Sequence, residues 1–214
     1  DLKFSNDVTV TLSGIKARFP HLLQSTGLTL WKGSESLCQY LSAHPESVTD
    51  KSVIELGAGL GLCGIVAHKL GAGKTIITDG DTDTLKNMRR NVANNPSSNH
   101  MTPLRQTNDS IIACKQLLWG KNVEAFRERW APHHGFDVVM GGDIVYAQRS
   151  LKPLFETVLI LLSSAPGSIF LLSYVFRDGV TIDTVLAHAK QKGLEWVAPD
   201  ETEGVYVFSR RQES

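Results

Sequence analysis

The fold is decided by the stretch VIELGAGLG, residues 53–61. Its apolar beginning predicts a short buried strand over residues 52–56. Glycines at 57, 59 and 61 let the backbone turn sharply and approach a ligand with no side chain between them. Residues 60–70 are apolar enough for a buried helix, whose first N–H groups have no partner inside the helix. The stretch therefore predicts a strand, a ligand-binding loop and a helix, with a nucleoside as the ligand class.

Strands and helices alternate along the rest of the chain. Further strands are expected over residues 74–78, 111–118, 136–140, 168–174 and 204–209, and helices over 34–43, 81–94, 123–130, 151–162 and 181–192. Ser34 is the expected N-cap of the first of these helices. Such alternation predicts an α/β fold with βαβ units, a mostly parallel sheet and helices on both of its faces.

The length of 214 residues suits a single domain over 1–214. Residues 1–30 are expected to form a short strand or hairpin followed by a loop, and residues 31–209 to form the core. The segment 95–108, which is rich in Asn and Ser, is expected to be a loop.

Charge and cysteine content argue against several classes of protein. Lys plus Arg number 22 and Asp plus Glu number 22, so the chain lacks the basic excess of a typical nucleic-acid binder. The cysteines are few, widely spaced and expected to be reduced thiols in a cytoplasmic or nuclear protein. No apolar run reaches the roughly 20 residues of a membrane span. His133 and His134 lack a third ligand at metal spacing, so no metal site is expected.

The glycine loop alone leaves two ligands open. Residues 59–64 match the dinucleotide pattern G-x-G-x-x-G, and Asp79 follows about 20 residues later. The alternative frame E-x-G-x-G-x-G runs from Glu55 to Gly61 and suits a smaller ligand, with a methionine part along the loop. Glu55 then offers negative charge near an α-amino group and a sulfonium. In both frames Asp79 accepts hydrogen bonds from ribose hydroxyls.

Residues after the other strands are candidates because ligands bind beyond the carboxyl ends of such strands. Trp119 follows the third strand and can stack on an adenine. Asp143 and Tyr146 follow the fourth strand, where a carboxylate and a phenol can orient an amine. Capping of the next helix is the alternative role for Asp143. Gly142 allows close approach to a cofactor, and Tyr174 is a second candidate on the acceptor side.

The chain resembles the family-16 methyltransferases from about Leu28 to Ser209. The resemblance rests on the order of its motifs, which are Trp31, the loop 55–61, Thr78-Asp79, Leu118-Trp119-Gly120 and the D-x-x-Y motif Asp143–Tyr146. It implies a Rossmann-like class I fold with a seven-stranded sheet, and S-adenosylmethionine rather than NAD as the cofactor. Many members carry Ala where this chain carries Gly142, a small change that is expected to leave cofactor binding intact.

Together with the loop, the resemblance implies roles for individual residues. The expected cofactor-binding residues are Trp31, Glu55, Gly57, Ala58, Gly59, Gly61, Asp79, Trp119 and Gly142, and the expected catalytic residues are Asp143 and Tyr146. The family mostly methylates lysines of other proteins, among them translation factors and chaperones. The expected activity is therefore protein-lysine methylation by a monomeric, cytoplasmic or nuclear enzyme. Methylation of histidine, arginine, nucleic acid or a small molecule, and a non-catalytic binding module, are the alternatives.

Overall fold

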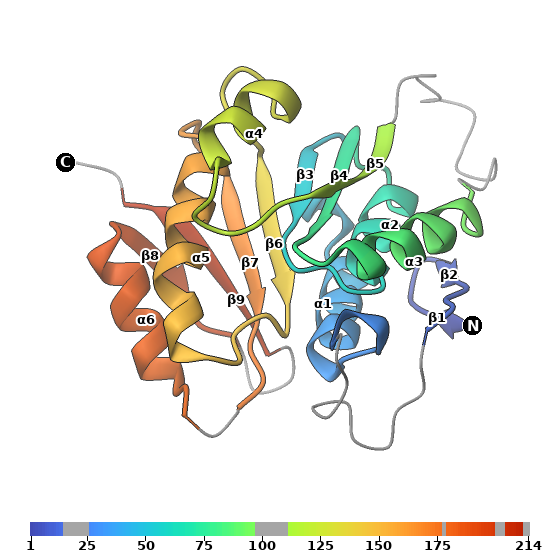
Figure 1. Cartoon of the computed structure of the whole chain (residues 1–214), viewed down its shortest axis with the longest axis horizontal. Coiled ribbons are helices and arrows are strands. Elements are labelled where there is room, and N and C mark those ends of the chain that lie inside the picture. Colours follow the sequence, from blue (N-terminus) through green and yellow to red (C-terminus); the bar gives the residue numbers. More distant parts are fainter. Residues whose placement is uncertain (15–25, 97–110, 177–178, 200–203, 212–214) are drawn as a thin grey trace.

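The computed structural model describes residues 1–14, 26–96, 111–176, 179–199 and 204–211, and its centre is one seven-stranded sheet (Figure 1). The strand order is β5-β4-β3-β6-β7-β9-β8. The strands from β5 to β7 in this order run parallel, whereas β9 is antiparallel to both of its neighbours. The bounds are β3 (Ser52–Glu55), β4 (Lys74–Asp79), β5 (Ile111–Gln116), β6 (Val138–Gly142), β7 (Ile169–Ser173), β8 (Leu194–Val197) and β9 (Val205–Arg210).

Helices cover both faces of this sheet, as the alternation predicts (Figure 1). One face carries α1 (Lys32–Ala43), α2 (Leu62–Lys69) and α3 (Thr82–Ala93), and the other carries α4 (Val123–Trp130), α5 (Gln148–Leu161) and α6 (Ile182–Gln191). Each face has its own buried apolar cluster. In the second cluster Phe155, Phe170 and Phe208 meet with ring centroids 5.5 to 6.2 Å apart. The predicted α/β class is confirmed.

The place of a binding site follows from the pairing of β3 with β6 at the middle of the sheet. From β3 the chain continues outward to β4 and β5, whereas from β6 it continues to β7 on the opposite side. The strand order therefore reverses between β3 and β6. The loops that follow β3 and β6 therefore lead away in opposite directions. Ligands of open α/β sheets bind between two such loops, at the carboxyl ends of the strands.

The structure differs from the prediction at three elements. Ser34 is not an N-cap, because α1 begins at Lys32 with Trp31 in the N-cap position and no side-chain capping bond. Helix α5 begins at Gln148 instead of residue 151 and contains Pro153. The prediction also omits β8, which is short and is stabilised by antiparallel pairing with β9. Such pairing is a tertiary contact that no local pattern of the sequence contains.

The N-terminal segment contains the expected hairpin, in which β1 (Leu2–Lys3) pairs with β2 (Thr9–Val10). Most of the predicted loop 95–108 lies outside the described residues. In the part of the chain that is described, no helix has the length and apolar character needed to cross a lipid bilayer.

Asn91 of α3 joins the N-terminal segment to the glycine loop. Its side chain is fully buried, and its Oδ1 accepts a hydrogen bond from the Ser13 amide at 2.8 Å. Its Nδ2 donates to the carbonyl oxygens of Ser13 at 3.1 Å and Leu60 at 3.0 Å. One side chain thus satisfies backbone groups of two segments that are far apart in the sequence.

Replacing Asn91 by Ala should lower the free energy of unfolding by about 1–3 kcal/mol, because buried backbone groups lose their partners. Denaturant unfolding of the purified chain measures this change. Asn94→Ala, at an exposed position at the end of the same helix, is the matched control and should change stability by less than about 0.5 kcal/mol. Equal losses in the two variants would contradict this role of Asn91.

Candidate active site

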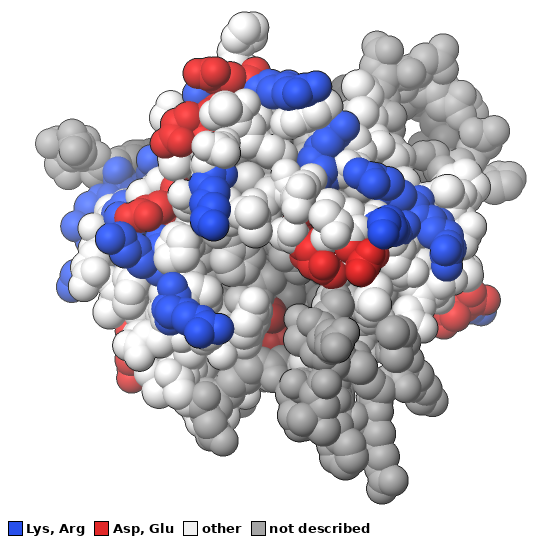
Figure 2. All heavy atoms as spheres, in the orientation of Figure 1, with Lys and Arg blue, Asp and Glu red and all other residues white. Residues whose placement is uncertain are grey.

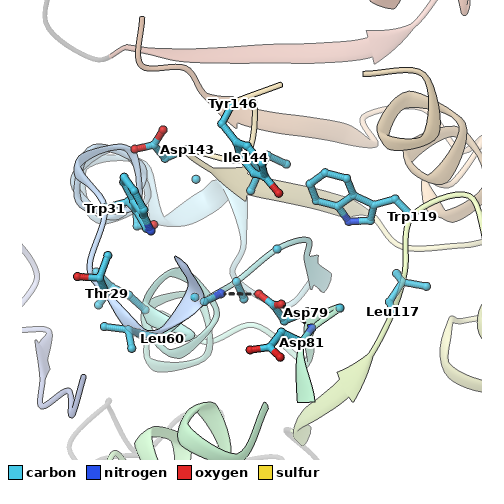
Figure 3. Close-up of a pocket in the computed structure, with 18 of the residues that line it drawn as sticks. Thr29, Trp31, Leu60, Asp79, Asp81, Leu117, Trp119, Asp143, Ile144 and Tyr146 are labelled. Atoms are coloured by element: carbon cyan, nitrogen blue, oxygen red, sulfur yellow. Dashed lines mark hydrogen bonds between the residues drawn. The ribbon is translucent and has the colours of Figure 1, made fainter. Parts of the chain in front are cut away.

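A cavity of about 1230 Å³ opens at the carboxyl ends of the central strands (Figure 3). Its walls come from the start of α1 and from the loops after β3, β4, β5 and β6. Most of the residues predicted from the sequence line it, namely Trp31, Gly57, Ala58, Gly59, Asp79, Trp119, Gly142, Asp143 and Tyr146. Glu55 and Gly61 do not. The volume exceeds that of typical single-ligand pockets, which reach about 1,000 Å³, so it has space for two reactants.

Glycine is required in the loop after β3 for conformation and for space. Gly57 has a φ of +59° and Gly59 a φ of +54°, which is the left-handed region that glycine adopts without cost. A Cβ atom on Gly57 would lie 3.0 Å from Ile144 Cγ2 and 3.1 Å from the Trp119 ring. The loop is tied to β4, because Ala58 N donates to the carbonyl oxygen of Thr78. Trp119 and Ile144 can therefore pack directly against the backbone of Gly57.

Asp79 stands at the end of β4 with its carboxylate held in place by the backbone. Its Oδ2 accepts a hydrogen bond from Gly59 N at 3.0 Å, and its Oδ1 accepts one from Asp81 N at 3.0 Å (Figure 3). Burial raises the pKa of this carboxyl above its usual value. Carboxylate oxygens have further lone pairs, so Asp79 can accept hydrogen bonds from a pair of hydroxyl groups in the cavity.

Glu55 lies behind the loop, which corrects the expectation that it places negative charge beside the ligand. Its side chain is buried and its Oε2 accepts a hydrogen bond from Gly64 N of α2 at 2.7 Å. Burial raises the pKa of the Glu55 carboxyl to about 8, so it is mostly neutral at pH 7. Gly61 also faces inward, where a Cβ atom would lie 3.0 Å from Met88 Cγ. Both residues shape the loop from behind.

Asp143 has a left-handed backbone, with a φ of +59°, and its side chain faces the beginning of α1. Its Oδ2 accepts a hydrogen bond from Gly33 N at 3.4 Å, while its own N–H donates to the Ser173 carbonyl at 3.1 Å. The alternative role as cap of the next helix is wrong, because the N-cap of α5 is Ala147. A carboxylate at a helix N-terminus is stabilised by the helix dipole.

Close packing of β6 on α1 requires two glycines. A Cβ atom on Gly33 would lie 2.7 Å from the Asp143 Cβ, and one on Gly142 would lie 2.8 Å from the Ser34 Cα. Gly142 lines the cavity, but its absent side chain makes room for the helix. Alanine at 142 would therefore require a shift of α1 in this chain. That Gly142 leaves cofactor binding intact stays a prediction.

Aromatic side chains form the rest of the cavity wall. Trp31 lies beside Asp143, with Trp119 on the opposite side and Tyr146 between them (Figure 3). Tyr146 is 59% exposed. Phe176, which the sequence analysis missed, also lines the cavity and is 70% exposed. Its position shortly after the end of β7 was a usable signal.

Tyr174, the second acceptor-side candidate, does not line the cavity. Its hydroxyl donates to the Val180 carbonyl oxygen at 2.7 Å. His133 and His134 are exposed, and within the described ranges no group of three or more His, Cys, Asp or Glu side chains could hold a metal ion.

The raised pKa of Glu55 predicts a pH dependence of stability. Between its ordinary pKa of 4.5 and about 8, the folded chain keeps a proton that the unfolded chain has released. Stability should therefore fall as the pH rises through this window. Glu55→Gln cannot ionise and retains an oxygen that can accept from Gly64 N. Relative to this variant, wild type should lose more than about 1.4 kcal/mol between pH 5 and pH 8.

Urea unfolding at several pH values measures this difference. A constant difference between wild type and Glu55→Gln across the window would show that Glu55 is ionised at low pH in the folded chain. Asp183→Asn, at an exposed position on α6, controls for the loss of a carboxylate as such.

Known structures share the fold. The chain resembles the ribosomal protein L11 methylase of Lactobacillus delbrueckii subsp. bulgaricus, with a TM-score of 0.60 at 17% identity, over 86% of this chain and 81% of that one. It also resembles the magnesium protoporphyrin IX methyltransferase of Synechocystis, solved with bound S-adenosylhomocysteine, with a TM-score of 0.58 at 10% identity, over 83% and 81%. These likenesses confirm the predicted class I methyltransferase fold.

Other proteins resemble this chain more closely in sequence than these solved structures do. The chain is 31% identical over 172 residues to a protein N-terminal and lysine N-methyltransferase of Neurospora crassa. The matching region covers 78% of this chain and 57% of that protein. It is 37% identical over 150 residues to a protein N-lysine methyltransferase of Xenopus tropicalis, over 69% and 60%. The chain thus spans little more than half the length of these relatives. Residues 19–185 match the lysine methyltransferase family. On this evidence of sequence and fold, the chain belongs to the lysine methyltransferase family.

Proposed function

We propose that the chain transfers a methyl group from S-adenosylmethionine to a lysine side chain of another protein. The observation that carries the proposal is that one cavity joins two different walls. Asp79 and the glycine loop form one wall, and Asp143 and Tyr146 stand on the other. The relatives named above are protein-lysine methyltransferases, and a further one, from Arabidopsis thaliana, is a calmodulin-lysine N-methyltransferase that is 26% identical over 82% of this chain.

The first wall fits a nucleoside cofactor. Asp79 would accept hydrogen bonds from the ribose hydroxyls, and Trp119 would pack against the adenine. Gly57, Ala58 and Gly59 expose backbone along which the methionine part would lie. Bound S-adenosylmethionine would supply an electrophilic methyl group on a sulfonium. Glu55 would not contact the cofactor. It accepts a hydrogen bond from Gly64 N at the start of α2 and carries little charge.

The second wall fits an amine. A lysine amine attacks only in its neutral form and must lie in line, about 3 Å from the methyl carbon. Asp143 and Tyr146 can orient its N–H bonds, and the carboxylate stabilises the cation that develops on the nitrogen as the new bond forms. Trp31 and Tyr146 can enclose the lysine stem and exclude water. This arrangement requires no covalent bond to the enzyme.

The substrate of this reaction is a protein, and translation factors and chaperones are the candidate classes. We further infer that the chain acts as a monomer in the cytoplasm or the nucleus. Incubation of the chain with S-adenosylmethionine carrying a tritiated methyl group in a cell extract, with one half of the sample then treated with nuclease, tests the proposal. Label should appear on lysine in protein, and loss of the label with nuclease would contradict the proposal.

Replacing Asp143 by Asn should lower methyl transfer by about 100-fold or more. Asparagine tolerates a positive φ and keeps an oxygen for Gly33 N, so α1 should stay in place. Affinity for S-adenosylhomocysteine, measured by calorimetry, should stay within a few-fold of wild type. Asp143→Ala should lose transfer as well. Normal transfer by the Asn variant would show that the charge of Asp143 does not act on the acceptor.

Replacing Asp79 by Ala should weaken S-adenosylhomocysteine binding at least about tenfold, because ribose hydroxyls lose a charged acceptor. The same calorimetric titration measures this loss. Asp83→Ala, at an exposed position in the first turn of α3 that does not line the cavity, is the matched control and should bind as wild type does. Equal affinity of the two variants would contradict the placement of the ribose.

A further inference from the structure

Two positive side chains stand on the first turns of α5, immediately after the D-x-x-Y motif. Arg149 and Lys152 are both exposed. Neither forms an ion pair or side-chain hydrogen bond with any residue that the structure describes. The nearest acid on the same helix, Glu156, is already paired with Lys192 at 3.1 Å. Among the residues that the structure describes, these two cations therefore have no acidic partner.

This charge lies at the mouth of the cavity. Pro153 lines the cavity four residues after Arg149, and residues four apart share one side of a helix. Lys152 is three residues from Arg149 and neighbours it on the helix surface, and both stand beside the cavity without lining it. Tyr146, which also lines the cavity, precedes the helix by two residues. Arg149 and Lys152 therefore flank the aromatic wall on which the acceptor lysine would lie.

The mouth is polarised across its width. Figure 2 shows positive side chains over the beginning of α5 on one side of the central hollow, and negative side chains over the beginning of α3 on the other. Asp81 is the N-cap of α3, and Asp79 and Asp81 both line the cavity. Lys121, two residues after Trp119, also lines the cavity. The net charge of the chain is zero, so this polarity is local.

Exposed aromatic surface accompanies the positive charge. Tyr146 and Phe176 are 59% and 70% exposed and line the same cavity. Apolar rings can hold the hydrocarbon stem of a lysine, while charges at a rim steer an oppositely charged partner and suppress like-charged ones. A segment with several positive charges beside its target lysine would be repelled by α5. A segment with carboxylates there would be attracted.

We propose that Arg149 and Lys152 are the docking site for an acidic segment of the protein substrate. The inference rests on the proposed function and adds the chemical class of its substrate. The target lysine enters between the aromatic side chains, and Asp or Glu residues close to it in sequence pair with the two cations. An extended chain advances about 3.3 Å per residue, so carboxylates within a few residues of the target lysine are the ones that can reach the two cations.

The test compares Arg149→Glu/Lys152→Glu with wild type in a cell extract, with methylated sites located by mass spectrometry. Wild type should label lysines with Asp or Glu within a few residues, and the variant should label the same sites at least tenfold more slowly. Arg89→Glu/Arg90→Glu makes the same change in net charge at exposed positions on α3 and should stay within twofold. Both variants should bind S-adenosylhomocysteine as wild type does.

A charge exchange completes the test. The acidic residues beside the best-labelled lysine are replaced by Lys in the purified substrate. Wild type should then lose transfer, and Arg149→Glu/Lys152→Glu should regain at least part of it. Normal labelling by the reversed variant, or equal losses in the α3 control, would overturn this inference alone. Absence of lysine labelling by wild type would overturn the proposed function, and the inference with it.

Discussion

The contact between Asp143 and the beginning of α1 is the constraint on which the acceptor side depends. The Asp143 carboxylate accepts from Gly33 N while its backbone stays in the left-handed region. A positive φ is costly for most residues, and the helix dipole can offset part of that cost by stabilising the negative charge. The same contact brings Trp31, at the helix N-cap, to the cavity beside Asp143. Displacement of α1 would separate these side chains.

The cofactor side is built on a different principle. The loop after β3 is held from behind by Glu55, whose burial raises its pKa to about 8, and by backbone bonds to β4. The charged group on the cofactor side is Asp79, whose carboxylate oxygens accept hydrogen bonds from Gly59 N and Asp81 N. A neutral acid behind the loop and an acid at the cavity surface thus have separate tasks, although each is the last residue of a buried strand.

Local patterns of the sequence predicted the elements and the residues at strand ends, because the period of apolar residues and the glycines act at short range. Asp79, Trp119 and Tyr146 were found in this way. The partner of Asp143 could not be found, since Gly33 lies 110 residues away in the sequence. The protonation of Glu55 depends on burial by several elements. Strand β8 depends on pairing with β9, and Phe176 was missed although it follows a predicted strand.

A crystal structure of the chain with S-adenosylhomocysteine would locate both walls of the cavity relative to the ligand. The ribose hydroxyls should lie about 2.6–3.2 Å from the Asp79 carboxylate, with the adenine against Trp119 and the sulfur atom facing Asp143 and Tyr146. A ligand whose ribose lies away from Asp79, or whose sulfur faces away from Asp143, would contradict the claim that one cavity joins cofactor and acceptor.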